Sequence, residues 1–382
     1  MTDITKNSQT ITSLSQAIDY FQETRCKYPE RDAEAASLAA IGGTRRKYPV
    51  LTMRFQPRSN DKDKCVYEYQ LPEVSMPATD EGGLARDVVN LLAPLQMLNP
   101  VGKTLSLGDN FPSSLIPSFG IPLNPEAQNS PAFTRSMEDV LSDDPPDPAN
   151  SGLLSDMHRR IDLIKEYLPD YFKISLPDMQ GPYNLAHAIV GEDAFLMPHL
   201  HPDRFHRLME RITVFWIEAR KNLLNRIGQD RLHLPITTIA ECSTNLISSE
   251  MYKEFVLPYD IQIAETFGSV NIHTCSGPHI FHVTLENIPN VVMTEAGFVS
   301  NTAAGHTPIE EALKAIGDRP VTLRIGQELP EGNEFEFVKK DLDLYDNNPR
   351  LLFDYTGMHW WNKDCPRIRD IHRRLDEYWE NK

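Results

Sequence analysis

The chain has 382 residues, of which 40% are hydrophobic and 24% charged, as is typical of a globular protein with a sizeable core. Its formal net charge of −16 argues against nucleic acids and anionic membrane surfaces as partners. No apolar run approaches the roughly 20 residues of a membrane span. The first residues contain no apolar signal core, and the 5 cysteines are scattered, so we expect a cytoplasmic protein with reduced thiols.

Apolar segments that predict strands recur along the chain, and helical patterns separate most of them. In chain order these segments are 49–55, 104–107, 171–176, 236–241, 270–273, 291–295, 320–325 and 350–353. Several are continuous apolar runs, as parallel strands covered on both faces should be. The clearest helical pattern runs from Pro202 to Gly228, and another covers residues 248–267 with a kink expected at Pro258. Strands alternating with helices in this way predict an α/β fold, a (β/α)8 TIM barrel.

The predicted barrel accounts for residues 49–382 as a single domain. Residues 1–48 are predicted to form an N-terminal helical extension that covers one end of the barrel. The segment 111–150 is rich in Pro, Ser and Asp, and we expect it to form a long loop after the second strand. Long insertions of this kind often bind substrate or close over it.

Polar side chains gather where the predicted strands end, which is where chemistry takes place in such barrels. They are Arg54, Arg58, Asp109, Asp178, Gln180, Glu241, Cys242, His273, Cys275, Glu295, Arg324, Gln327, Asp354 and Tyr355. A strand-end acid has a structural alternative, because it often only caps a helix or pairs with an arginine. The sequence leaves both interpretations open for Asp178 and Asp354 and favours the structural one for Glu241.

A short buried strand ends with His273 and Cys275, which lie two residues apart and therefore point to the same face. Glu295, at the end of the next strand, adds a third donor. A single His or Cys is usually a core or surface residue, but nitrogen, sulfur and oxygen donors together are what zinc requires. A mixed set with one open position suits catalysis better than a closed structural site. Cys365, or alternatively Asp354, would supply the fourth ligand.

Three segments resemble motifs of the uroporphyrinogen decarboxylase superfamily, whose members share a (β/α)8 barrel. Residues 181–186 (GPYNLA) resemble its Gly-Pro-(aromatic)-x-Leu-Ala turn, and residues 247–259 (ISSEMYKEFVLPY) its Ile-Ser-Pro-Glu-(aromatic)-x-x-Phe-x-x-Pro-Tyr helix. Residues 272–277 (IHTCSG) resemble its His-x-Cys-x-Gly strand end. The resemblance extends from about residue 49 to the end of the chain.

The pair of His273 and Cys275 is similar to the corrinoid-linked methyltransferase branch of the superfamily. In that branch, His-x-Cys and a later Cys bind zinc, which activates a thiol that takes a methyl group from methyl-corrinoid. Glu295 resembles the extra carboxylate ligand of related zinc methyltransferases. Where that branch carries its later Cys this chain has Thr356, and Cys365 lies further on.

A second branch contains the decarboxylases of haem biosynthesis, which bind a porphyrinogen through arginines and polarise a pyrrole with an Asp, without a cofactor. Residues 53–58 (MRFQPR) resemble that branch's Met-Arg-x-x-x-Arg, and Asp109 falls near the position of its Asp. The decarboxylases lack His-x-Cys. A third alternative is a non-catalytic barrel that binds a tetrapyrrole.

The sequence therefore predicts a zinc-dependent methyltransferase that moves a methyl group between a corrinoid (cobalamin) carrier and a thiol or similar acceptor. The chain has no Asp-x-His-x-x-Gly signature for corrinoid binding, so the corrinoid would arrive on a separate partner protein. The family is compatible with a homodimer. The predicted site residues are Asp109, Arg54, Arg58 and Tyr355 as catalytic residues in the cleft, Gln180, Tyr183 and Arg324 as substrate contacts, and His273, Cys275, Glu295 and Cys365 (or Asp354) as metal ligands.

Overall fold

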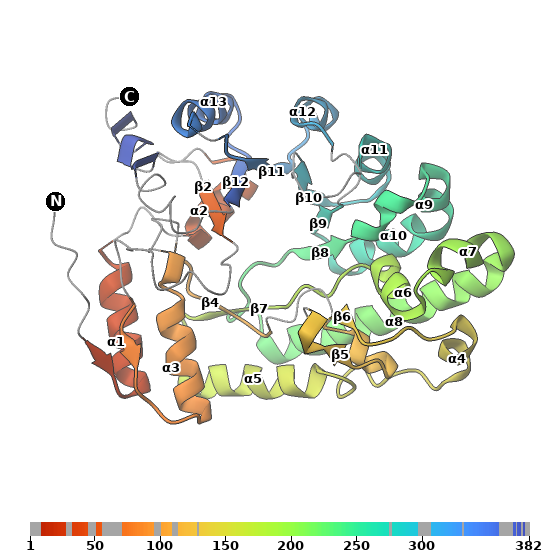
Figure 1. Ribbon diagram of the computed structural model, residues 1–382, viewed down its shortest axis with the longest axis horizontal. Helices are drawn as coiled ribbons and strands as arrows, with labels where there is room; N and C mark the ends of the chain where they lie inside the picture. The colour runs from red at the N-terminus through yellow and green to blue at the C-terminus, as the bar shows by residue number, and fades with distance from the viewer. Residues whose placement is uncertain are drawn as a thin grey trace. The chain divides into compact units, whose positions relative to one another are not determined.

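Figure 1 presents the computed structural model of the chain. It describes all residues except 1–8, 28–32, 45–50, 56–70, 95–100, 109–113, 128–129, 275–276, 297–306, 331, 359–369, 372, 376 and 379–382. For Arg54 and Asp354, which lie in strands, only the backbone is described. None of the helices in the described ranges is long and apolar enough to cross a membrane.

The chain folds into two compact units. The first comprises Met1–Leu105, Gly297–Asn301 and Thr322–Lys382, and the second comprises Ser106–Ala296 and Thr302–Val321. The first unit therefore joins the two ends of the sequence, whereas the second is built mostly from its middle. The division into a 1–48 extension and a 49–382 barrel remains a prediction.

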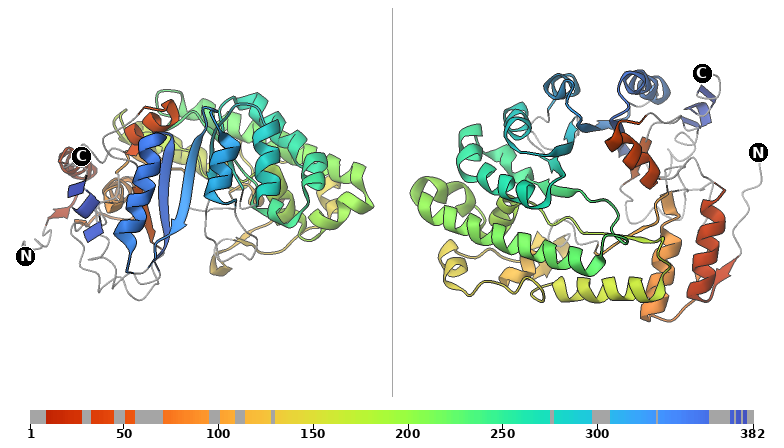
Figure 2. Two further views of the ribbon diagram at one scale, coloured as in Figure 1. Left: turned by 90° about the horizontal axis from the view of Figure 1, so that it is seen from above. Right: turned by 180° about the vertical axis from the view of Figure 1, so that it is seen from behind.

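The first unit contains a parallel sheet in which β12 pairs with both β11 and β2. Phe353 lies opposite Ile325 on one side and opposite Leu51 on the other. Helix α13 packs on β12, as the views in Figure 2 show. The elements of this unit are β1 (Thr10–Ile11), α1 (Leu14–Arg25), α2 (Ala33–Gly42), β2 (Leu51–Phe55), β3 (Glu73–Val74), α3 (Asp80–Asn90), β11 (Thr322–Glu328), α13 (Glu334–Asn347) and β12 (Leu351–Met358), while β4 (Thr104–Ser106) crosses into the second unit.

The two N-terminal helices make different contacts within the first unit. Ser13 caps α1 through its side chain, and α1 packs against α3 with Leu14, Ala17 and Phe21 buried. The end of α2 is bound to the sheet instead, because Thr322 Oγ1 donates to the Ala40 carbonyl at 3.2 Å. The helical character predicted for this part of the sequence is thus present.

The second unit contains a parallel sheet of β8, β9 and β10, with α9, α10 and α11 lying beside one another next to it (Figure 1). Thr238 lies opposite Asn271, and Asn271 lies opposite Met293. The elements of this unit are η4 (Ile116–Phe119), β5 (Leu123–Asn124), η5 (Pro125–Ala127), β6 (Ser130–Pro131), α4 (Met137–Ser142), α5 (Leu154–Tyr167), β7 (Lys173–Ser175), α6 (Pro182–Val190), α7 (Asp193–Leu200), α8 (Pro202–Ile227), β8 (Thr237–Ala240), η6 (Cys242–Leu246), α9 (Ser249–Phe255), α10 (Leu257–Phe267), β9 (Val270–His273), α11 (Pro278–Asn287), β10 (Val291–Ala296) and α12 (Ile309–Ile316).

Helix α8 is the main packing element of the second unit. Its apolar stripe, which includes Phe205, Trp216 and Leu223, is fully buried, and the helix contacts α4, α5, α6, α7 and α10. Gly228 ends it with a φ of +79°, a conformation that glycine adopts without a Cβ penalty. The helix predicted over 202–228 is therefore confirmed.

The helix predicted over 248–267 is two helices in the structure. Helix α9 ends at Phe255 and α10 begins at Leu257, so the break falls at Val256 rather than at Pro258. The physical reason is that proline fits the first turn of a helix, where no backbone N–H is needed. Pro258 therefore starts α10 instead of kinking a longer helix.

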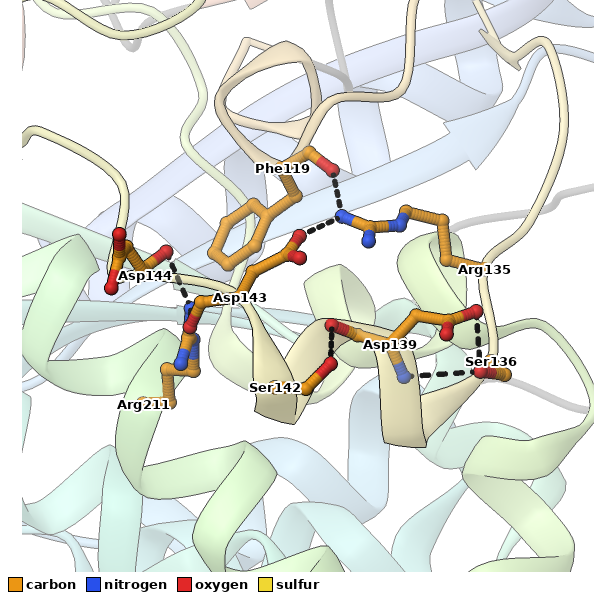
Figure 3. Close-up of polar contacts among 8 residues, drawn as sticks. All are labelled: Phe119, Arg135, Ser136, Asp139, Ser142, Asp143, Asp144 and Arg211. Atoms are coloured by element: carbon orange, nitrogen blue, oxygen red, sulfur yellow. Dashed lines mark hydrogen bonds and ion pairs between the residues drawn. The ribbon is translucent and has the colours of Figure 1, made fainter.

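The segment 111–150 is predicted as a loop, and its described residues, 114–127 and 130–150, contain short elements and are held by arginine contacts (Figure 3). Arg135 Nη1 donates to the Phe119 carbonyl at 3.0 Å and forms an ion pair with Asp143 at 2.7 Å. Arg211 of α8 donates to the carbonyls of Asp143 and Asp144, both at 2.7 Å. The end of α4 is therefore attached to α8 and is not a free lid.

We expect Arg211→Ala to increase hydrogen exchange selectively in residues 143–150, because it removes the charged donor of two carbonyl hydrogen bonds. Each such bond is worth about 1.5–3 kcal/mol when one partner is charged. Amide exchange followed by mass spectrometry measures the change. Arg207→Ala is the matched control, since Arg207 is exposed one turn earlier on α8. Equal exchange in the two variants would show that Arg211 does not hold this segment.

Candidate active site

The candidate site lies at the carboxyl ends of β9 and β10. The parallel register places Thr294 opposite Ile272, so the residues that follow them come to the same level. His273 Nδ1 lies 2.6 Å from Glu295 Oε2, and this side chain of Glu295 is only 7% exposed. The imidazole is 24% exposed. A buried carboxylate therefore fixes the orientation of a histidine ring that reaches solvent.

Asp178, which follows β7, is a further acid of this site. Burial raises the pKa of its carboxyl, and the backbone N–H of Gln180 opposes that change. The charge of His273 lowers the pKa of Asp178, and the charge of Glu295 raises it. The sequence left the role of Asp178 open, and the structure places it within electrostatic reach of the histidine–carboxylate pair.

Gln180, a predicted substrate contact, is buried and has a left-handed backbone with a φ of +54°. Its N–H donates to Asp178 Oδ1 at 2.7 Å, and its carbonyl accepts from Trp216 Nε1 at 2.7 Å. Its side-chain Oε1 accepts from Asn184 Nδ2, and its Nε2 is buried with no hydrogen-bond partner. Strained residues cluster at functional sites, and a substrate contact of Gln180 remains a prediction.

Glu241 holds the start of helix α6. Its Oε1 accepts the backbone N–H of Tyr183 at 2.9 Å, and its Oε2 accepts that of Asn184 at 2.8 Å. These are two of the N–H groups that a helix N-terminus leaves without intrahelical partners. The structural role favoured for Glu241 is confirmed, although the helix it caps follows β7 and not its own strand.

A second buried carboxyl, Asp260 of α10, is hydrogen-bonded to Glu241 and accepts the Tyr252 hydroxyl at 2.6 Å. Burial raises the pKa of Glu241 and raises that of Asp260 to about 7, and the repulsion between two carboxylates favours keeping one proton on the pair. The two backbone N–H groups stabilise the ionised form of Glu241. The buried pair therefore retains one shared proton.

Gly181 lies so close to this carboxyl that a Cβ there would overlap the Glu241 side chain. We expect Gly181→Ala to destabilise the fold by about 1–3 kcal/mol or more, because the carboxylate must leave the helix terminus. Chemical denaturation measures the loss. Gly83→Ala is the control, since no atom lies within 4 Å of a Cβ built at Gly83 in α3. If both variants are equally stable, close contact with Glu241 does not constrain position 181.

Two predicted tyrosines have structural contacts. Tyr183 is fully buried, its hydroxyl donates to the Ala194 carbonyl at 3.3 Å, and its ring packs on Phe205. Tyr355 is also buried, and its hydroxyl donates to Asp341 Oδ2 of α13 at 2.6 Å. Burial and the charge of Asp341 raise the pKa of Tyr355 well above its usual value. These contacts give both residues packing roles, and a catalytic or substrate-binding role remains a prediction.

For the other predicted site residues the structure gives fewer contacts or no side-chain position. Arg324 is half-buried on β11 of the first unit. Among the described residues, no group of three or more His, Cys, Asp or Glu side chains is arranged to hold a metal. The predictions that lie outside the described residues or side chains are those for Arg54, Arg58, Asp109, Cys275, Asp354 and Cys365.

The parallel strands, the helices between them and the polar strand ends define an α/β protein, and comparisons with known proteins give its family. The sequence pattern of uroporphyrinogen decarboxylase (URO-D) matches residues 114–318, more than half of the chain. The chain belongs to this family, whose fold is a TIM barrel, so the predicted fold class and superfamily are confirmed.

Solved structures share this fold at low sequence identity. A methyltransferase from Methanosarcina mazei superposes with a TM-score of 0.58 at 13% identity, over 96% of this chain and 99% of that one. No curated protein sequence matches the chain.

Proposed function

We propose that the protein is a zinc-dependent methyltransferase that transfers a methyl group between a corrinoid carrier and a thiol acceptor. The observation that supports this most directly is the 2.6 Å contact between His273 Nδ1 and Glu295 Oε2 at neighbouring strand ends. Cys275 follows His273 by two residues. The name of the structurally similar methyltransferase agrees with this choice of branch.

The donor set fits zinc in its chemistry. Because Nδ1 of His273 is bound to Glu295, Nε2 is the ring nitrogen that would bind the metal, an arrangement common among histidine ligands. Cys275 would add a thiolate, and Glu295 would either orient the imidazole or bind directly. Cys365 or Asp354 would complete the set. Bound zinc would lower the pKa of the acceptor thiol, so that thiolate is present near neutral pH.

The remaining chemistry belongs to the chain's own residues. Asp178 has a carboxyl whose pKa is raised by burial, and it lies within electrostatic reach of His273. It would accept the proton that the thiol releases, and the thiolate would form its bond to the methyl carbon as the cobalt–carbon bond of the methyl donor breaks and leaves its electron pair on cobalt. The proposed cleft residues Arg54, Arg58 and Asp109 would then position the methyl donor.

Metal analysis of the purified chain tests this proposal. We expect about one zinc per chain in the parent protein and little in His273→Ala or Cys275→Ala. His282→Ala is the matched control, because His282 of α11 pairs with Glu311 of α12 and not with a residue at a strand end. Turnover is then measured with methyl-corrinoid and a set of small thiols.

Two results would contradict the proposal. Metal-free protein that decarboxylates a porphyrinogen would assign the chain to the decarboxylase branch. Tight tetrapyrrole binding, seen as an absorbance shift without turnover of any methyl donor, would assign it a binding role. We also propose a separate corrinoid protein as the partner. Methyl transfer should then be faster from a corrinoid bound to such a protein than from free corrinoid.

A further inference from the structure

A cavity of about 270 Å³ lies within the second unit, between the segments that follow β7 and precede β8. These segments are joined at two points. Ile174 exchanges hydrogen bonds with Arg231 and His233 at 2.8 and 3.0 Å, and further along Gly181 N–H donates to the Ala240 carbonyl at 2.7 Å. The cavity lies between these points and is lined by Ser175, Leu176, Pro177, Asp178, Met179, Arg220, Leu232, His233, Leu234, Ile236, Thr238, Asn271 and Met293.

Arg220 of α8 brings a positive charge into this cavity. The residue is only 6% exposed, Nη2 donates to the Ile236 carbonyl at 3.1 Å, and Nε is buried with no hydrogen-bond partner. Its guanidinium lies 5.7 Å from the ring centre of Trp216 and 5.4 Å from that of Phe267. In the described part of the chain no carboxylate forms an ion pair with it. Burial lowers the pKa of Arg220 to about 10, so the charge persists at neutral pH.

A buried charge without a counter-charge is costly, and proteins normally pair it. The aromatic rings and one carbonyl offset part of that cost. A guanidinium can also donate two parallel hydrogen bonds to a carboxylate, and Arg220 retains an unused donor in Nε. The structure therefore favours an anion in the cavity.

The other lining groups restrict which anion fits. Asn271 Nδ2 donates to Thr238 Oγ1 at 3.4 Å, and these two residues form a polar part of the cavity lining. Met179, Leu234 and Met293 supply apolar wall. A phosphate dianion would call for more than one cation, whereas a single guanidinium matches one carboxylate. The volume corresponds to roughly nine water molecules at about 30 Å³ each, which suits a small organic molecule.

We propose that this cavity binds a small aliphatic monocarboxylate, with its carboxylate on the Arg220 guanidinium and its chain against Met179, Leu234 and Met293. The proposal does not depend on zinc or on methyl transfer, because every group it uses lies outside the His273–Glu295 pair. Asp178 lines this cavity and is also within electrostatic reach of that pair.

Isothermal titration of the full chain with acetate, butyrate, hexanoate, butyramide and inorganic phosphate tests the proposal. We expect butyrate or hexanoate to bind, and butyramide, which has the same shape without the charge, to bind at least about tenfold more weakly. Arg220→Gln should weaken carboxylate binding by about 10–100-fold, the range expected when a charged hydrogen-bonding group is removed. Arg226→Gln, which removes an exposed arginine on the same helix, should leave it unchanged.

Two further variants keep the test decisive if Arg220→Gln does not fold. Arg220→Lys retains the charge and should bind butyrate with intermediate affinity, while Leu234→Trp retains Arg220 but fills the cavity and should abolish binding. The proposal is overturned if no carboxylate binds the parent chain, if phosphate binds more tightly than butyrate, or if Leu234→Trp binds as the parent does.

Discussion

A Glu295→Gln variant is expected to bind zinc roughly 10–100-fold more weakly than the parent chain. Glu295 Oε2 lies 2.6 Å from His273 Nδ1, and the carboxylate is buried, so its charge acts on the imidazole with little screening. Glutamine has the same shape but no charge, and it therefore loses the effect that fixes the tautomer and makes the ring more basic. Zinc affinity measured by competition with a chromophoric chelator gives the ratio.

The matched control for this experiment is Glu286→Gln, which makes the same chemical change at an exposed position of α11. It should bind zinc as the parent does. Unchanged affinity in Glu295→Gln would mean that the Glu295–His273 contact has no part in a metal site. A loss of secondary structure in the variant, monitored by circular dichroism, would instead identify the contact as one the fold requires.

Asp260→Asn should flatten the dependence of stability on pH. Burial raises the pKa of Asp260 to about 7, from about 3.8 in the unfolded chain, so the folded chain holds an extra proton between these values. A folded-state pKa above the unfolded value gives stability that is present at low pH and is lost as pH rises through about 7. The parent should therefore lose roughly a few kcal/mol of unfolding free energy between pH 4 and pH 8 because of this carboxyl pair.

Asparagine retains the shape of the protonated acid, accepts from the Tyr252 hydroxyl and donates an N–H to Glu241. The variant should match the parent near pH 5 and exceed it in stability near pH 8, as measured by urea unfolding at several pH values. Glu265→Gln changes an exposed carboxylate of the same helix and should leave the parent's pH dependence intact. A parent chain whose stability is flat from pH 4 to pH 8 would show that Glu241 and Asp260 do not retain a proton.

The strands and the longest helix could be predicted because burial leaves a regular signal in the sequence. The apolar residues of α8 recur at helical spacing, and β10 begins with three consecutive apolar residues, so the sequence predicts both with nearly correct limits. The short elements within 111–150 leave no such period, because they depend on a few contacts from Arg135 and Arg211 to backbone carbonyls. Contacts of this kind are visible only in three dimensions.

Part of the site could be predicted because the ends of the strands can be recognised in the sequence. His273 and Glu295 end neighbouring parallel strands, and a shared sheet edge brings such residues together. The partnership of Glu241 with Asp260 could not be found, because Asp260 lies within a helix and not at a strand end, where the sheet edge would bring it to Glu241. The sequence does contain a sign of the buried position of Arg220. It lies four residues after Trp216 and three before Leu223, on the buried stripe of α8. A charged residue on an apolar stripe is itself an indication of a binding site.

The pairing of β2 with β12 has a consequence for how the protein is made. Leu51 lies opposite Phe353, so β2 leaves the ribosome about 300 residues before its partner strand exists. At about 5–20 residues per second, this interval lasts roughly 15–60 s. During that time the second unit, which is drawn mainly from the middle of the chain, can fold, while β2 has no β12 strand to pair with. Nascent β2 therefore lacks its β12 partner until the last part of the chain has been made, and slower translation of that part would lengthen this interval.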